Sequence, residues 1–229
     1  MATTHRLVLQ ATGGYKPPMR WRTSPPVYHP LGFIEPCLPT LAGMAPSGPQ
    51  WVHEIKHDGF RFICRRDGDR VRVFSRNGRD WTDRVPLIAE ALAKLRVKSV
   101  TLDGEGVVCR PDGVSDFDRL RAAVGRLGSR DAFLYAFDLL ELDGENMRPY
   151  EWHVRRATLR SLIKRAGAGI RLSEHLDGDG AVAFRHACRM GLEGVVAKRR
   201  DRPYRSGRSP DWIKVKNPDA PAATRIMEW

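Results

Sequence analysis

The chain has 229 residues, which is enough for one large or two small domains, and its hydrophobic fraction of 41% is typical of a soluble globular protein. No segment approaches the ~20 consecutive apolar residues of a membrane span, and the apolar run 7–9 is too short for a secretory signal, so we expect a cytoplasmic protein. A net charge of +12 favours polyanionic partners such as nucleic acid or nucleotides, while four scattered cysteines without a C-x-x-C pair argue against a zinc knuckle or a redox motif.

Residues 1–30 are predicted to form a flexible basic tail. Nine of the 16 prolines fall within the first 50 residues, and the first 30 carry basic residues without apolar periodicity. Two interpretations stay open: a tail that contacts phosphates, and one that is only solvated. We expect the folded domain to span residues 31–217 and a short C-terminal tail to cover 218–229.

Short β-rich runs dominate the first half of the predicted domain. Residues 60–64 and 71–74 flank the turn sequence 67–69, which predicts a hairpin. Helix-start residues at 82–83 precede apolar positions at helical spacing, namely Val85, Ile88, Leu92 and Leu95. Residues 100–102 predict a strand that runs directly into Asp103-Gly104-Glu105.

The second half mixes helices and strands. Ser115 and Asp118 form a capping-box pattern ahead of a helix that continues through Val124. The remaining predicted elements are a buried strand over 132–142, helices over 152–166 and 180–190, and strands over 194–198 and 212–216. Since this mixture is irregular and shows no internal repeat, we predict an α+β fold of packed antiparallel sheets flanked by helices.

The run Glu54-Ile55-Lys56-His57-Asp58-Gly59-Phe60-Arg61 contains Lys56, which is the main candidate for a nucleophile in this chain. A lysine can attack phosphorus through nitrogen only after losing its proton, and an ordinary pKa of ~10.4 makes that loss cost roughly 4–5 kcal/mol at pH 7. Neighbouring cations or burial are therefore needed to activate it. Candidates for the positive field are Arg61, Lys198, Lys214, Lys216 and a metal ion.

This run resembles the Lys-x-Asp-Gly-x-Arg signature of covalent nucleotidyltransferases, which include ATP-dependent DNA ligases, RNA ligases and mRNA capping enzymes. Five later segments resemble further motifs of that superfamily in the same order: Ser75-Arg76-Asn77-Gly78, Asp103-Gly104-Glu105, Phe137-Asp138-Leu139-Leu140, Glu193 to Lys198, and Trp212 to Lys216. The upstream segments 36–40 and 51–54 resemble the ligase domain of bacterial non-homologous end-joining proteins. That likeness favours a DNA ligase.

The resemblance implies an ATP-grasp-like nucleotidyltransferase fold, ATP and Mg²⁺ as cofactors, and Lys56 as the nucleophile that becomes a lysyl-AMP. Phe137 would stack on adenine, Glu54 would accept from its amino group, and Glu105 and Glu193 would serve the ribose and the metal. His57 lies at a variable position of the signature, and we expect no catalytic role for it. The implied ATP-binding set is Glu54, Ile55, Lys56, Arg61, Arg76, Glu105, Phe137, Glu193, Lys198, Lys214 and Lys216.

The implied partner is nicked or broken double-stranded DNA, sealed in DNA repair after AMP passes to a 5′-phosphate and a 3′-hydroxyl displaces it. The expected DNA contacts are Arg76, Asn77, Arg199, Arg200 and Arg208. For the basic segment 198–208 two interpretations stay equally open: it holds the phosphate backbone of DNA, or it is a solvated loop. We expect a monomer in the bacterial nucleoid, with a separate OB-fold or end-binding repair protein as a second partner.

The sequence stops about a dozen residues after the last motif, so we expect no C-terminal OB-fold within it, and hence weak self-adenylation and a weak grip on DNA. Two other functions stay open: a non-catalytic module that binds nucleotides or DNA ends, and an RNA ligase or guanylyltransferase. Structural roles also stay open at this point, because Phe137 could be a core residue, Glu105 and Glu193 surface carboxylates, and Arg76-Asn77-Gly78 a turn.

Overall fold

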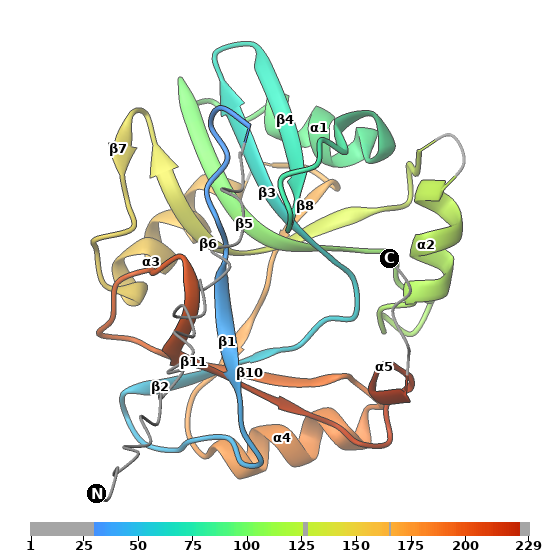
Figure 1. Ribbon diagram of the computed structural model, residues 1–229, viewed down its shortest axis with the longest axis vertical. Helices are drawn as coiled ribbons and strands as arrows, with labels where there is room; N and C mark the ends of the chain where they lie inside the picture. Colours follow the sequence, from blue (N-terminus) through green and yellow to red (C-terminus); the bar gives the residue numbers. More distant parts are fainter. Residues whose placement is uncertain (1–29, 126–127, 165, 225–229) are drawn as a thin grey trace, which may run out of the picture.

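The computed structural model describes residues 30–125, 128–164 and 166–224. The predicted tail, apart from its last residue, and residues 225–229 of the predicted C-terminal tail lie outside the described part. Two β-sheets are stacked one above the other, with helices on their outer sides (Figure 1). Among the described residues, no helix has the length and apolar character needed to cross a membrane.

The lower sheet in Figure 1, sheet A, has the strand order β1-β11-β10-β2-β9. Its strands are β1 (Cys37–Leu41), β2 (Trp51–Ile55), β9 (His175–Leu176), β10 (Gly194–Arg199) and β11 (Gly207–Lys216). The pairings are antiparallel except for β1 with β11, which run parallel. The helix α4 (Gly180–Arg189) packs on this sheet against β10 and β2.

The upper sheet, sheet B, has the order β4-β3-β5-β6-β7, and β8 joins the side of β6 in parallel. Its strands are β3 (Phe60–Asp67), β4 (Arg70–Ser75), β5 (Ser99–Val107), β6 (Phe133–Leu142), β7 (Glu145–Asn146) and β8 (Ile170–Leu172). The helical elements are η1 (Thr82–Arg84), α1 (Pro86–Ala93), α2 (Phe117–Gly125), α3 (Trp152–Ile163) and α5 (Pro221–Thr224). The predicted α+β fold of packed sheets is confirmed, with the two parallel pairings as an addition.

Side-chain alternation along the strands divides the core. In β3, Phe62 and Cys64 point into a large apolar cluster under α1 and α3, while Ile63 points the other way. Ile63 joins a smaller cluster with Phe137 and Trp212, which come from different sheets. This second cluster holds the two sheets together, and the strand ends next to it carry the sequence motifs.

Two predicted helix starts are displaced. The first helix begins at Pro86, because residues 82–84 form a separate 3-10 turn and proline is well suited to the first helical position. At α2 the side chain that caps the first turn is that of Asp116, whose Oδ1 accepts from the backbone N–H of Arg119 at 3.0 Å. Ser115 instead lies in a bridge with Cys109.

A buried ion pair fastens α3 to sheet B. Arg155 donates from Nε and Nη2 to the two carboxylate oxygens of Asp138 at 2.7 and 2.9 Å, and both side chains are essentially inaccessible. Asp138 belongs to the predicted Phe-Asp-Leu-Leu motif, so one position of that motif is structural. Removing one partner of such a pair leaves a charge buried without compensation.

We therefore expect Asp138→Ala to lower the free energy of unfolding by about 3–5 kcal/mol, as measured by urea denaturation. The control is Glu90→Ala, which breaks the exposed pair between Glu90 and Arg130 and should cost less than about 1 kcal/mol. Equal losses for the two variants would contradict the assigned role of the buried pair.

Candidate active site

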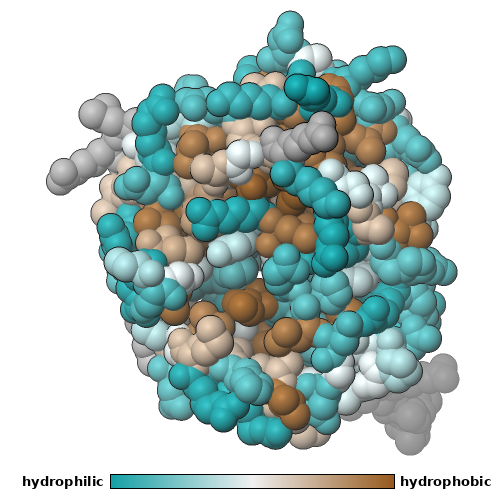
Figure 2. Space-filling view, turned by 180° about the vertical axis from the view of Figure 1, so that it is seen from behind, coloured by the Kyte–Doolittle hydropathy of each residue, from teal (hydrophilic) through white to brown (hydrophobic). Residues whose placement is uncertain are grey.

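A cavity of about 220 Å³ opens between the two sheets. It collects most of the residues predicted to bind the nucleotide, namely Glu54, Ile55, Lys56, Arg61, Arg76, Glu105, Phe137, Lys198 and Lys214, together with Arg208 from the predicted DNA contacts. On the rear face of the molecule, a hollow with apolar surface is surrounded by long hydrophilic side chains (Figure 2). A partly apolar cavity with convergent charged groups is the usual form of a ligand site.

Lys56 directly follows β2 and is held from sheet A. Its backbone N–H donates to the carbonyl oxygen of Gly194 at 3.0 Å, and its Nζ lies 2.5 Å from Glu193 Oε1. Lys214, on the neighbouring strand β11, has a pKa lowered by burial and then by the positive charges of Lys56 and other cations close to it. The amine of Lys56 is thus in contact with a carboxylate and within the field of a cationic group.

Glu54 and Lys198 form a second, fully buried ion pair. Lys198 Nζ donates to Glu54 Oε2 at 2.8 Å and lies 4.3 Å and 4.0 Å from the ring centroids of Phe137 and Trp212. Burial raises the pKa of Glu54 and lowers that of Lys198, and the attraction between the two charges opposes both shifts. Glu54 Oε1 is buried and has no hydrogen-bond partner among the described residues, so one acceptor of this carboxylate is unused.

Arg61 is anchored within the protein. Its Nε and Nη2 donate to Asp103 at 2.5 and 2.7 Å, and its guanidinium lies 4.4 Å from the centroid of the Phe137 ring. The hydroxyl of Tyr204 donates to Asp103 Oδ2 at 2.6 Å and accepts from the backbone N–H of Cys37 at 2.7 Å. Asp103 and Tyr204 were absent from the predicted site. Asp103 lies within the predicted Asp-Gly-Glu motif, whereas no pattern in the sequence indicated a role for Tyr204.

Glu105 and Glu193 approach Lys56 from the two sheets. Glu105 lies opposite Arg61 in the β3–β5 pairing, and desolvation raises the pKa of its carboxyl group to about 7 against the opposing effects of Arg61 and Lys56. Glu193 also raises it, so the two carboxylates are near one another. Their hard oxygen donors fit Mg²⁺, which takes few protein ligands and fills its shell with phosphate and water. No group of three or more metal-ligating side chains is found among the described residues.

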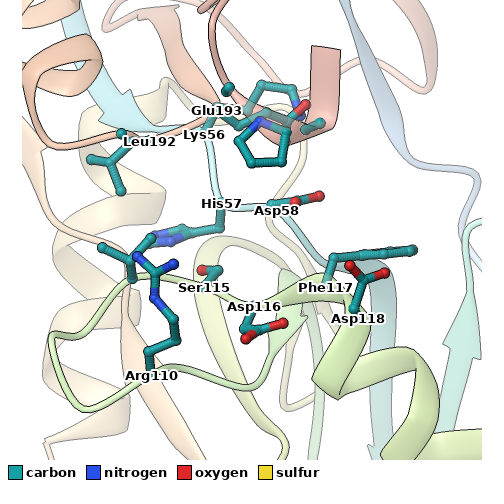
Figure 3. Close-up of a pocket in the computed structure, with 15 residues that line it drawn as sticks. Lys56, His57, Asp58, Arg110, Ser115, Asp116, Phe117, Asp118, Leu192 and Glu193 are labelled. Atoms are coloured by element: carbon teal, nitrogen blue, oxygen red, sulfur yellow. The ribbon is translucent and has the colours of Figure 1, made fainter. Parts of the chain in front are cut away.

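A second cavity, of about 230 Å³, is also lined by Lys56 (Figure 3). Lys56 and Glu193 lie along one side of it, the start of α2 with Asp116 and Asp118 lies opposite, and His57 lies between them. Lys56 and His57 line both cavities. Sequence reasoning gave no indication of this second cavity.

Several predicted contacts lie apart from the nucleotide-sized cavity. Lys216 is exposed at the end of β11, and Asn77 is exposed in a turn in which Gly78 N–H donates to the Ser75 carbonyl oxygen. Arg199 is paired with Asp201 through two hydrogen bonds at 2.9 and 2.8 Å, and Arg200 is paired with Asp177. These two arginines therefore carry less free charge than the sequence suggests.

Two motif glycines allow strands to approach closely beside the nucleophile. A Cβ atom at Gly59 would lie 2.3 Å from the carbonyl oxygen of Gly106. Gly194 has φ +138°, and a Cβ there would lie 2.0 Å from the carbonyl oxygen of Val215. Both positions require glycine for steric reasons, which supplies the physical role of the Asp-Gly pair that follows the lysine.

The raised pKa of Glu105 predicts a pH-dependent stability. Its folded-state pKa of about 7 exceeds the ordinary 4.5, so folding favours the protonated form, and the associated stability is lost as the pH rises from 5 through 7. We expect the free energy of unfolding of the wild type to fall relative to Glu105→Gln over this window, by at most about 1.4 kcal/mol per pH unit. Denaturant unfolding at several pH values measures this, with Glu90→Gln as an exposed control; parallel wild-type and Glu105→Gln curves would refute it.

Comparisons with known proteins agree on one family. Residues 40–216 match the model of the "ATP dependent DNA ligase domain". The chain is 40% identical over 185 residues to the "Multifunctional non-homologous end joining protein LigD" of Pseudomonas aeruginosa, covering 80% of this chain and 22% of that protein. It is 34% identical over 202 residues to a "Probable DNA ligase" of Sorangium cellulosum, covering 81% of this chain and 38% of that protein.

Two solved structures show the same fold. A "mycobacterial DNA ligase D complexed with ATP and MES" superposes with a TM-score of 0.67 at 38% identity, covering 79% of this chain and 59% of that one. The ligase domain of Mycobacterium tuberculosis LigD gives the same TM-score and identity and is covered over 58% of its length. The chain spans about a fifth of the length of the LigD relatives that it matches. With the family model covering most of its length, the chain belongs to the ATP-dependent DNA ligase domain family.

Proposed function

We propose that this chain is the adenylation domain of an ATP-dependent DNA ligase that acts in double-strand-break repair by end joining. The observation that carries the proposal is the placement of Lys56, which lines the nucleotide-sized cavity together with Glu105 and Lys214 and whose amine contacts Glu193. One relative with this fold is described as complexed with ATP, and others are named non-homologous end-joining proteins. The nucleophile, two carboxylates and surrounding cations are the parts that phosphoryl chemistry requires.

The base of ATP would bind at the inner end of the cavity, where Phe137 and Val196 provide apolar surface. Glu54 Oε1, which has no partner among the described residues, would accept a hydrogen bond from the 6-amino group of adenine. A fixed carboxylate acceptor disfavours a base that presents a carbonyl oxygen at that position. This arrangement supports ATP over GTP and so favours a ligase over a guanylyltransferase.

The triphosphate would lie toward the open side of the cavity. Lys198 and Arg61 are already neutralised by Glu54 and Asp103, which leaves Lys214, Arg76 and Arg208 to face the phosphate oxygens. Their positive charges would stabilise the negative charge that develops on the α-phosphate in the transition state.

Lys56 would give up its proton, attack the α-phosphorus of ATP and release pyrophosphate. Glu193 Oε1, which lies 2.5 Å from the amine, would accept that proton. Glu105 and Glu193 would hold Mg²⁺, which when bound neutralises phosphate charge. The lysyl-AMP would then pass AMP to a DNA 5′-phosphate, after which a 3′-hydroxyl would seal the strand and release AMP.

The DNA would cross the exposed basic surface next to the cavity. Arg76 and Arg208 line the cavity rim, so they would contact the nicked strand or the phosphates of the nucleotide, while Asn77, Arg199 and Arg200 lie further out. A net charge of +12 supports binding to the DNA backbone. A monomer, and a separate OB-fold or end-binding protein as a partner, complete the proposal. A module that binds without catalysis is less well supported, because Lys56 and both glutamates meet at one site.

Incubation with α-labelled ATP and Mg²⁺, followed by denaturing electrophoresis, tests the proposed chemistry. We expect the wild-type chain to acquire a label that is stable to alkali and labile to acid, as a phosphoramidate is. Lys56→Ala should lose it, whereas Lys94→Ala, which alters an exposed lysine at the end of α1, should keep it. An unlabelled wild type, or a labelled Lys56→Ala, would reject the proposal.

The base contact can be tested with a triphosphate of purine riboside, which lacks the 6-amino group. Because a hydrogen bond to a charged acceptor contributes ~1.5–3 kcal/mol, the wild type should label at least about tenfold more efficiently with ATP than with this analogue. Glu54→Gln should reduce that preference, and Glu174→Gln, on an exposed side chain, should leave it intact. An undiminished preference in Glu54→Gln would exclude the proposed contact.

A further inference from the structure

Residues 56–59 form the crossover between the two sheets. They link the end of β2 in sheet A to the start of β3 in sheet B, and Lys56 is the first of them. The contacts of Lys56 with Gly194 and Glu193 tie the crossover to sheet A only. Its position relative to sheet B must come from the residues that follow.

The imidazole of His57 provides a contact to sheet B. It stacks face to face on the phenol ring of Tyr135 in β6, with ring centroids 4.0 Å apart and an angle of 9° between the planes. Tyr135 is the register partner of Glu105 in β5. The stack therefore connects the residue after the nucleophile to the strand position directly beside Glu105.

The tyrosine ring is itself supported on its strand. Phe133 packs against it edge to face at 4.9 Å, and the guanidinium of Arg171 lies 4.1 Å from the Phe133 centroid. Burial, and then the charge of Lys56, lowers the pKa of His57 to about 4, so its ring is neutral at physiological pH. The contact is thus one between two uncharged rings, and a phenyl ring could replace the imidazole.

His57 also lines both cavities that meet at Lys56. The second cavity carries Asp116 and Asp118 opposite Lys56 (Figure 3). These carboxylates would attract an ammonium group that left the nucleotide cavity. His57 lies between Lys56 and these carboxylates (Figure 3), so its ring would limit that movement.

We propose that His57 is a positioning residue, whose stack on Tyr135 fixes the crossover so that the Lys56 amine stays in the nucleotide cavity, aligned for attack. The inference rests on the proposed adenylation by Lys56. Displacement of a reacting atom by about 1 Å can lower a rate by ~100-fold, so loss of the ring should affect the chemical step more than ATP binding.

The test is rapid-quench measurement of lysyl-AMP formation in a single turnover, over a range of ATP concentrations, with the 229-residue chain. We expect His57→Leu, which retains bulk without an aromatic face, to lower the maximal rate constant about tenfold or more while changing the half-saturating ATP concentration less than about threefold. His57→Phe should stay within about threefold of the wild type. His153→Leu, on an exposed histidine of α3, is the matched control.

The double variant His57→Leu/Tyr135→Leu identifies the partner. If the two rings act together, Tyr135→Leu should reproduce the loss of His57→Leu, and the double variant should be no slower than either single one. Multiplied losses, a His57→Phe as slow as His57→Leu, or a wild-type rate in His57→Leu would each overturn the inference. A wild type that forms no adduct would reject the proposed function and, with it, this inference. If the wild type does form the adduct, a contrary result from the His57 variants rejects only the inference about His57.

Discussion

The bidentate ion pair between Arg61 and Asp103 is the constraint on which the site depends. Arg61 lies in β3 and Asp103 in β5, and Asp103 also accepts from Tyr204, whose hydroxyl in turn accepts from the backbone of Cys37 in β1. The network therefore joins sheet B to the edge strand of sheet A. A buried pair of this kind is favourable only when its remaining hydrogen-bonding groups are satisfied, and here the tyrosine and the backbone satisfy them.

This network lies within the apolar cluster that holds the two sheets together. Phe137 is packed against Trp212 at 6.0 Å and receives the cationic groups of Arg61 and Lys198 near its ring. The same residue thus serves the core and lines the cavity. The two interpretations of Phe137 that the sequence left open are compatible, because a ring at the rim of a core cluster can present one part of its surface to a ligand.

Much of the fold was predictable where local pattern and tertiary environment agree. The hairpin around Gly68, the long strand β6 and the helix that ends before Gly191 all carry turn or cap residues next to clear apolar runs. The strands β1 and β2 were missed, because they are short and β1 contains Pro39, which lies where the register with β11 shifts. A proline is tolerated at such an irregularity but weakens the strand signal.

The predicted site residues converge more closely than their charges suggested. Order along the chain brought Lys56 and Glu193 to one place, yet it could not reveal that Lys198 pairs with Glu54, 144 residues away, or that Arg199 pairs with Asp201. Ion pairing depends on side-chain geometry, which the order of residues along the chain does not encode. The positive field at the Lys56 amine is consequently weaker than a count of lysines and arginines implies.

The short crossover has a mechanical consequence. Four residues leave little slack between β2 and β3, and Gly59 is already in close approach to Gly106. Any shear of one sheet against the other must then be transmitted to the lysine amine, with no flexible loop to absorb it. Substitutions that alter the packing between the sheets far from the cavity should therefore also change the reactivity of this nitrogen.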